Sequence, residues 1–225
     1  MKNLGPDLDQ RPSVSSRRIR EKNGGNKMPK KPKFTRESLL QEAYAIAEQQ
    51  GIDEVSSRSL AKSLGCSIQP IYTHFPTMAE LRQETFRYAC RQFSREILSC
   101  RADADPFEWT TQCVIDLARN RPNLFKLVFL SNGFTSRSLP ETMRDLLENQ
   151  RLVSRIMEKY DLDQQTCEDV ILRSELFLLG IGTMICSNHL SYQDQEVHAV
   201  MRRTVLDLVR GARKKHSVCV VSETH

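Results

Sequence analysis

The sequence predicts an all-α protein, and three observations lead to this fold class. Glycine and proline are scarce, with nine of each among 225 residues. Leucine, glutamate, arginine, glutamine and alanine, which favour helices, are common. Apolar residues recur at helical spacing in successive segments, most of which begin at a residue that can cap a helix. The length is enough for one large or two small domains with a buried core.

A basic segment precedes the first predicted helix. Residues 1–33 carry ten Lys or Arg and three acids, a net +7, so the rest of a chain at +5 carries −2. Residues 1–32 lack apolar periodicity, and we expect a disordered tail there. The stretch NGGNKM can be encoded with a ribosome-binding sequence just ahead of Met28. This suggests the hypothesis that the residues before Met28 are a mis-annotated extension.

The first predicted helix follows Thr35, a good N-cap, and stops at Gly51. Its apolar positions recur at helical spacing and are Leu39, Leu40, Ala43, Tyr44, Ile46 and Ala47. A short second helix is expected to be capped by Ser56 or Ser57 and to end at Gly65. The residues expected on its buried face are Leu60, Ala61 and Leu64.

A third helix follows after a turn of three residues. With Ser67 as its cap, Pro70 falls at the third helical position, where proline removes no intrahelical hydrogen bond. Ile71 and Phe75 lie four residues apart and can both face the core. Two short helices joined by a tight glycine-containing turn are typical of a helix-turn-helix, whose second helix enters the DNA major groove.

A family resemblance follows from the segment FTRESLLQEAYAIAEQQGIDEVSSRSLAKSLGCSIQPIYTHFPTMAEL. Nearly end to end, over about residues 33–85, it resembles the DNA-binding domain of the TetR family of bacterial transcriptional repressors. The resemblance implies an all-α homodimer. It also implies an N-terminal three-helix helix-turn-helix domain, here 33–93, and a larger α-helical domain that binds a small-molecule effector and dimerises, here 94–216. Residues 217–225 are expected to form a C-terminal tail.

Candidate DNA contacts follow from the position of the third helix and from the resemblance. The base-facing candidates are Ser67, Ile68, Gln69, Pro70 and Thr73. Glutamine can pair with adenine through two hydrogen bonds, and apolar side-chain groups can touch the thymine methyl. The candidate phosphate contacts, which set register without reading sequence, are Ser56, Ser57, Arg58, Tyr72, His74, Lys30, Lys31 and Lys33.

The sequence departs from the family pattern at Met78, where a lysine usually follows the Y-x-H-F motif. Residues 34–100 also carry seven Lys or Arg against eight acids, a net −1. Phosphate neutralisation supplies much of a protein's affinity for DNA. We therefore expect the lysines of the tail to contact the DNA backbone or minor groove beside the first helix.

Six helices are expected after the helix-turn-helix. They begin at Thr77 (to about Cys100), Asp105 with Pro106, Pro122, Ser138 (to about Tyr160), Asp163 (to about Asn188) and Asp194 (to about Arg213). Gly180 and Gly182 lie inside one of them, where each costs up to about 1 kcal/mol relative to alanine. We expect a neighbouring helix, the twin subunit or a ligand to approach closely there. The last two long helices resemble the pair that forms the family's dimer interface.

The pattern predicts neither a metal site nor a cofactor. The seven cysteines have no metal-ligand spacing, and we expect them to be small buried hydrophobes in a reducing cytoplasm. No apolar run is long enough to span a membrane, and no signal peptide is recognisable. The expected location is the bacterial cytoplasm, on the nucleoid when the protein is bound to DNA.

The leading hypothesis is a dimeric repressor that an unidentified small molecule releases from a palindromic double-stranded DNA operator. One alternative is an architectural, nucleoid-associated DNA-binding protein with the same fold. A second alternative is a small helical enzyme, although no phosphate-binding loop, nucleophile elbow or HExxH motif appears. No effector residue can be assigned from the sequence. Glu175 lies in an apolar helix, where it either binds a cationic ligand, is exposed to solvent or is paired with another residue.

Overall fold

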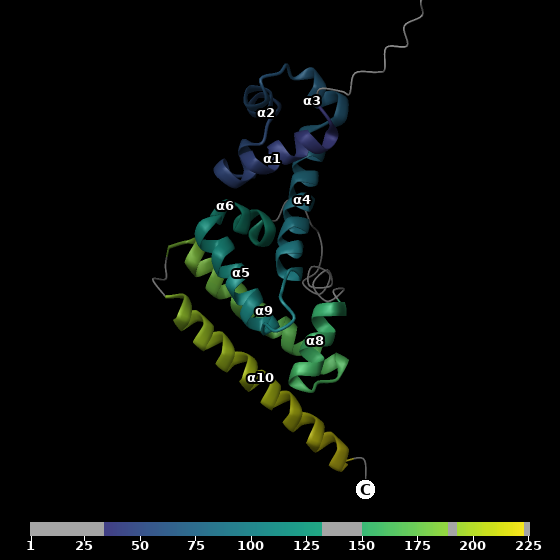
Figure 1. Ribbon diagram of the computed structural model, residues 1–225, viewed down its shortest axis with the longest axis vertical. Helices are drawn as coiled ribbons and strands as arrows, with labels where there is room; N and C mark the ends of the chain where they lie inside the picture. The colour runs from purple at the N-terminus through teal and green to yellow at the C-terminus, as the bar shows by residue number, and fades with distance from the viewer. Residues whose placement is uncertain (1–33, 132–149, 189–192, 223–225) are drawn as a thin grey trace, which may run out of the picture. The chain divides into compact units, whose positions relative to one another are not determined.

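The computed structural model describes residues 34–131, 150–188 and 193–222, with side chains as far as Arg213. Within these residues the secondary structure is helical and no strand occurs, which confirms the all-α fold class (Figure 1). The elements in chain order are α1 (Arg36–Gln50), η1 (Ile52–Glu54), α2 (Ser57–Leu64), α3 (Gln69–His74), α4 (Met78–Leu98), α5 (Pro106–Asn120), α6 (Pro122–Phe125), η2 (Lys126–Leu130), α8 (Gln150–Tyr160), α9 (Gln164–Cys186) and α10 (Asp194–Ser222).

Side-chain caps start the helices where the sequence predicts them. Thr35, Thr77, Asp105 and Asp163 each accept a hydrogen bond from a backbone N–H in the first turn of α1, α4, α5 and α9. Pro106 follows Asp105 at the start of α5, where it needs no hydrogen-bond partner. Each cap contributes about 1 kcal/mol, so the boundaries are determined locally.

The first three helices bury their apolar residues against one another and against α4. α1 packs on α2, α4 and α6. The residues at the centre of this core are fully buried: Leu39, Ala43, Leu60, Ile71, Phe75 and Leu81. The predicted buried faces of α1 and α2 are confirmed except at Tyr44 and Leu64, which are partly buried.

The remaining helices form the larger part of the fold. α5, α9 and α10 pack on one another, and α8 packs on α5 and α9 (Figure 1). α4 leads into this group and contacts α5, while α6 contacts the first helix. Both α1 and α4 of the helix-turn-helix part therefore touch helices of the C-terminal part.

Two predicted helix boundaries are changed and one cannot be compared. α10 continues to Ser222, so its expected end near Arg213 is wrong and residues 217–222 are helix rather than tail. The helix expected from Pro122 has only four α-helical residues and continues as the wider π-helical turn η2. The expected start at Ser138 lies outside the described residues, whereas the end at Tyr160 is confirmed.

The two glycines of α9 have different surroundings. A Cβ on Gly182 would lie 2.7 Å from the ring of Phe125 and 3.1 Å from Val114 Cγ1, so a neighbouring helix approaches closely as predicted. A Cβ on Gly180 would meet nothing within 4 Å. The expected close approach is therefore confirmed at Gly182, and no described residue of this chain makes one at Gly180.

The described cysteines are free thiols with mixed burial. Cys113, Cys167 and Cys186 are buried, and Cys66, Cys90 and Cys100 are partly buried. Burial raises the pKa of Cys113 to about 12 and that of Cys167 to about 11. Those two thiols thus stay protonated at neutral pH and behave as small hydrophobes, as expected from the sequence.

Candidate nucleic-acid interface

α2 is held at its start by a reciprocal pair of serines. Ser56 Oγ accepts a hydrogen bond from the backbone N–H of Ser59 at 3.1 Å, and Ser59 Oγ accepts one from the N–H of Ser56 at 3.0 Å. Ser56 is therefore the N-cap, and Ser57 is the first helical residue. At the other end Gly65 turns the chain with a φ of +60°, a conformation that glycine adopts without strain.

The third helix starts one residue later than its sequence predicts. Ile68, not Ser67, is the N-cap of α3, and no side chain caps this helix. Pro70 still lies within the first turn and breaks no intrahelical hydrogen bond. The conclusion about Pro70 therefore holds, whereas the predicted capping role of Ser67 is wrong.

Two residues anchor α3 and leave its opposite face open. Ile71 and Phe75 are both 0% exposed, while Ile68 is 48% exposed and Tyr72 43%. The guanidinium of Arg36 lies over the Phe75 ring, 4.5 Å from its centre. α3 is thus held through one face, as a helix that must enter a DNA groove requires.

The structure gathers the base-facing candidates at the start of this open face. Ser67, Ile68 and Gln69 are exposed and consecutive, and Thr73 is exposed one turn further on. Pro70 is only partly buried. The hydroxyl of Thr73 donates to the backbone carbonyl of Gln69 at 3.0 Å, so its methyl group is the part most free to meet a base.

The phosphate candidates of the described part lie in two different situations. Tyr72 of α3 donates its hydroxyl to Ser57 Oγ of α2 at 3.4 Å, which brings two exposed hydroxyls together from the two helices. Arg58 is exposed beside them. By contrast, Ser56 is occupied as a cap, and His74 Nε2 lies 3.2 Å from the carbonyl oxygen of Phe34. Lys30, Lys31 and Lys33 lie outside the described residues.

Sequence reasoning missed two arginines that hold the domain together. Arg36 pairs with Glu80 at 3.2 Å as well as covering Phe75. Arg82 of α4 donates to the backbone carbonyls of Val55 and Asp53, each at 3.0 Å, and so fixes the segment before α2. These contacts join residues 27 to 44 positions apart, so no local pattern identifies them.

Comparison with known proteins finds a family match for the segment that contains α2 and α3. Residues 39–85 match the family model described as bacterial regulatory proteins, tetR family. Over these residues the chain is similar to the helix-turn-helix domain of the TetR family. Its match ends just beyond the first residues of α4, close to the limit of the resemblance found in the sequence. No curated protein sequence matches the chain.

Solved structures are similar in fold to most of the chain. A transcriptional regulator from Rhodococcus sp. RHA1 has a TM-score of 0.61 at 17% identity, over 79% of this chain and 97% of that one. A tetR-family regulator from Streptomyces coelicolor gives 0.60 at 14%, over 80% and 88%. BioQ, solved with its natural double-stranded DNA operator, gives 0.53 at 16%, over 79% and 99%. At these identities the likeness concerns the fold.

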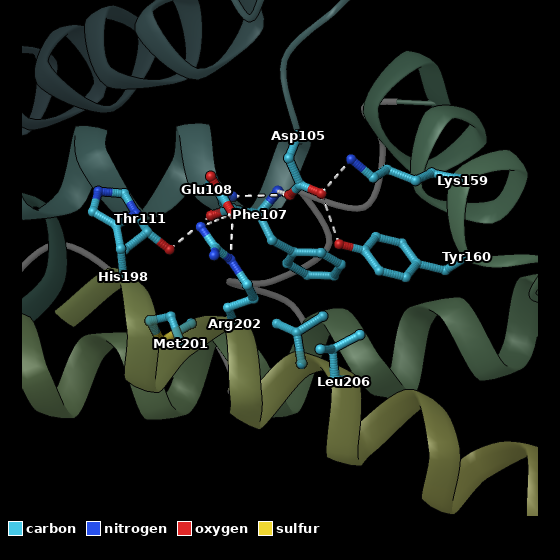
Figure 2. Close-up of a pocket in the computed structure, with 11 residues that line it drawn as sticks. Asp105, Phe107, Glu108, Thr111, Lys159, Tyr160, His198, Met201, Arg202 and Leu206 are labelled. Atoms are coloured by element: carbon cyan, nitrogen blue, oxygen red, sulfur yellow. Dashed lines mark hydrogen bonds and ion pairs between the residues drawn. The ribbon is translucent and has the colours of Figure 1, made fainter. Parts of the chain in front are cut away.

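A cavity of about 220 Å³ lies between α5, α8 and α10, away from the helix-turn-helix (Figure 2). Asp105 meets Lys159 Nζ at 2.6 Å and the hydroxyl of Tyr160 at 2.7 Å, and Arg202 of α10 pairs with Glu108 at 2.6 Å. Burial opposes ionisation of Asp105, but the hydrogen bonds from Lys159 and Tyr160 prevail and lower its pKa. The charged groups at this cavity thus satisfy one another and join the three helices.

Neither a metal centre nor a membrane span is found in the part of the chain that the structure describes. No cluster of three or more His, Cys, Asp or Glu side chains is arranged to hold a metal ion there. Among the same residues, no helix combines the length and apolar character needed to cross a bilayer.

Proposed function

We propose that this protein is a dimeric, ligand-responsive repressor that binds a near-palindromic DNA operator. One observation carries the proposal: α3 buries Ile71 and Phe75 completely while it presents Ile68, Gln69 and Tyr72 to solvent. This is the arrangement of a recognition helix that reads the major groove. The operator-bound structure of BioQ, which shares the fold, supports the same use of this domain.

Within this proposal, each DNA contact is assigned from the chemical nature of the side chain. Ser67, Ile68, Gln69, Pro70 and Thr73 face the bases, with Gln69 as the principal hydrogen-bonding reader. The phosphate contacts come from Ser57, Arg58 and Tyr72, with Ser56 and His74 at the edge of the interface and Lys30, Lys31 and Lys33 in the arm. Residues 33–93 serve as the DNA-binding domain and residues 94–216 as the effector and dimerisation domain, with α4 running through the boundary.

A homodimer is proposed from an exposed apolar stripe on α9. Leu176, Phe177 and Met184 are 40–45% exposed, and Gly180 lies between them with open space where a Cβ would be. Val200 of α10 is 44% exposed, on the side of that helix away from the cavity. Large apolar residues around a glycine favour close packing against a second copy of the same surface.

Effector binding is proposed to act through the end of α4. Glu96 of α4 accepts a hydrogen bond from Arg121 at 2.8 Å, and its carbonyl accepts one from Trp109 at 3.2 Å. Asn123 of α6 donates to the carbonyl of Glu48 in α1 at 3.1 Å. Because α5 and α6 hold both α4 and α1, a ligand that moves them changes the position of the recognition helix.

The base and phosphate assignments predict two different mutant phenotypes. Gln69→Ala should lose about 1–3 kcal/mol of discrimination at one operator position. Arg58→Ala should weaken binding to every sequence alike and lower the salt slope by about one. Titrations of operator variants over a range of salt measure both effects. Uniform loss in Gln69→Ala, with preference retained at every position, would contradict the assignment of this residue.

The basic arm predicts a salt-dependent deletion phenotype. The described DNA-binding region is close to neutral, whereas residues 1–33 carry a net +7. Removing residues 1–33 should therefore weaken operator binding and flatten its dependence on salt, since fewer counterions are released. The comparison is the slope of log affinity against log salt for the full chain and the deletion. An unchanged slope would mean that the arm does not contact DNA.

The dimer proposal predicts that a charge in the α9 stripe separates the subunits. Phe177→Asp places a carboxylate where an apolar surface is to be buried, and we expect monomers in sedimentation velocity runs. Leu98→Asp, at a 50% exposed position of α4, is the matched control and should leave the dimer intact. A Phe177→Asp protein that still sediments as a dimer would move the interface elsewhere.

A further inference from the structure

The cavity between α5, α8 and α10 is lined on its inner side by residues of the core (Figure 2). Phe107 is 7% exposed, Met201 3% and Val205 2%. Protein cores are close-packed, and unfilled space next to core residues lowers stability. An apolar cavity of about 150 Å³ can hold a benzene molecule. A cavity of about 220 Å³ therefore has room for one ring and a small polar group.

The acids at this cavity have little hydrogen-bonding capacity left. Asp105 Oδ1 accepts from two backbone N–H groups in the first turn of α5, at 2.8 and 3.0 Å. Its Oδ2 accepts from Lys159 and from the hydroxyl of Tyr160, so both oxygens are in use. Glu108 accepts two N–H groups of Arg202 on Oε1. The acids therefore offer only Glu108 Oε2 to a ligand.

The two bases keep more capacity. A lysine ammonium has three N–H groups and an arginine guanidinium has five. Lys159 uses one on Asp105, and Arg202 uses two on Glu108. No other described residue accepts a hydrogen bond from either base. Arg202 also lies near Tyr160, because it opposes the rise in the pKa of that hydroxyl caused by burial and by the bond to Asp105. Spare donors thus gather around Tyr160.

We propose that this cavity binds a small organic carboxylate with an apolar body, and that this carboxylate is the effector. The carboxylate accepts hydrogen bonds from Arg202 and Lys159 on the open side, and the apolar part fills the space beside Phe107. A planar guanidinium matches the two oxygens of a carboxylate. A cation fits less well, since it would meet two bases and one spare acceptor oxygen. The effector role, unlike binding itself, rests on the proposed ligand-responsive function.

A carboxylate at this site would affect the position of α5. The Glu108–Arg202 ion pair joins α5 to α10, and a ligand that bonds to Arg202 competes with Glu108 for it. The next residue of α5, Trp109, donates its indole N–H to the carbonyl of Glu96 in α4 at 3.2 Å. A shift of α5 is therefore transmitted to α4, which leads to the helix-turn-helix.

Binding is measured by isothermal titration calorimetry on the full chain without DNA. The probes are benzoate and 3-phenylpropanoate, which carry the same head group on apolar bodies of two lengths. Each is compared with its uncharged amide, and benzoate also with benzamidinium, a cation of the same shape. We expect at least one carboxylate to bind with a dissociation constant below about 1 mM. Its amide, and for benzoate also benzamidinium, should bind at least about tenfold more weakly.

Four variants test the placement of the ligand. Arg202→Gln and Lys159→Gln should each weaken binding about tenfold to a hundredfold, as for loss of a charged partner. Leu206→Trp keeps every charge but fills space at a 38% exposed position that lines the cavity, and it should weaken binding as well. Arg203→Gln is the matched control, because it removes an exposed arginine of the same helix that does not line the cavity. It should bind as wild type does.

The proposal is overturned if neither carboxylate binds, if the amide or benzamidinium binds as tightly, or if Arg202→Gln and Lys159→Gln both bind as wild type does. A carboxylate that binds is then added to the protein on a DNA fragment that it captures. We expect it to release the DNA from wild type, and from Arg202→Gln only at higher concentration. Binding without release of DNA would contradict the effector role alone. Failure to capture any DNA would contradict the proposed repressor and leave the binding result intact.

Discussion

Replacing Phe75 with alanine is expected to destabilise the folded protein by about 3–5 kcal/mol and to abolish operator binding. The ring is completely buried at the end of α3 and carries the guanidinium of Arg36 on one face. Its removal leaves a cavity that the surrounding helices cannot close without moving α3. On the proposed function, DNA binding is lost because α3 loses its support, since Phe75 is buried and lies on the face of α3 opposite the proposed DNA contacts.

Urea unfolding of Phe75→Ala is to be followed by circular dichroism and by fluorescence of Trp109, the single tryptophan. Tyr72→Ala is the matched control, because this neighbouring aromatic is 43% exposed. It should keep its stability within about 0.5 kcal/mol of wild type and still lose operator affinity. A Phe75→Ala protein as stable as Tyr72→Ala would contradict the packing described for α3.

Glu175→Gln is expected to stabilise the protein, and to do so increasingly as the pH rises. The pKa of the carboxyl is raised by burial from 4.5 to about 7 in the folded state. Below pH 4.5 the carboxyl is protonated in both states and costs nothing. Between pH 4.5 and 7 the carboxyl ionises in the unfolded chain but stays protonated in the folded protein, so stability falls as the pH rises, by up to about 3 kcal/mol above pH 7.

The measurement is the difference in free energy of unfolding between wild type and Glu175→Gln at several pH values. It should grow from a few tenths of a kcal/mol near pH 4.5 to about 3 kcal/mol at pH 8. Glu168→Gln, which removes an acid of the same helix that bonds to Gln164, should differ from wild type by less than about 0.5 kcal/mol at both extremes. A difference between wild type and Glu175→Gln that does not change with pH would show that the pKa of this carboxyl is not raised in the folded protein.

Much of the fold was predictable because its signals are local. Caps such as Thr35, Thr77 and Asp163 identify helix starts within one turn of chain. Apolar spacing identified Ile71 and Phe75 as the anchors of α3. The end of α10 was missed for the same reason. Apolar spacing shows only where a helix packs, and α10 continues past Val209, the last buried residue among those whose side chains the structure describes.

The sequence predicts which segment forms the candidate interface. It does not predict the distant contacts that hold this segment in place. Spacing and turn chemistry placed Ile68 and Gln69 on the exposed start of α3. The roles of Arg36 and Arg82 depend on contacts with distant parts of the chain, which one sequence does not reveal. Glu175 could be noticed in an apolar helix. Only the structure shows that Ile171, Ser174 and Leu178 nearby on the helix are buried, and that no described residue forms an ion pair with it.

The proposal that this protein is a sequence-specific regulator is tested most directly by genome-wide capture of DNA fragments. The purified protein is used at physiological salt. The expected result is a small number of sharp peaks that share a near-palindromic site, since a two-fold dimer requires symmetric half-sites. Broad capture without sequence preference would favour an architectural DNA-binding protein and would contradict the proposal of a sequence-specific repressor. Capture of no fragment at all would contradict DNA recognition by α3.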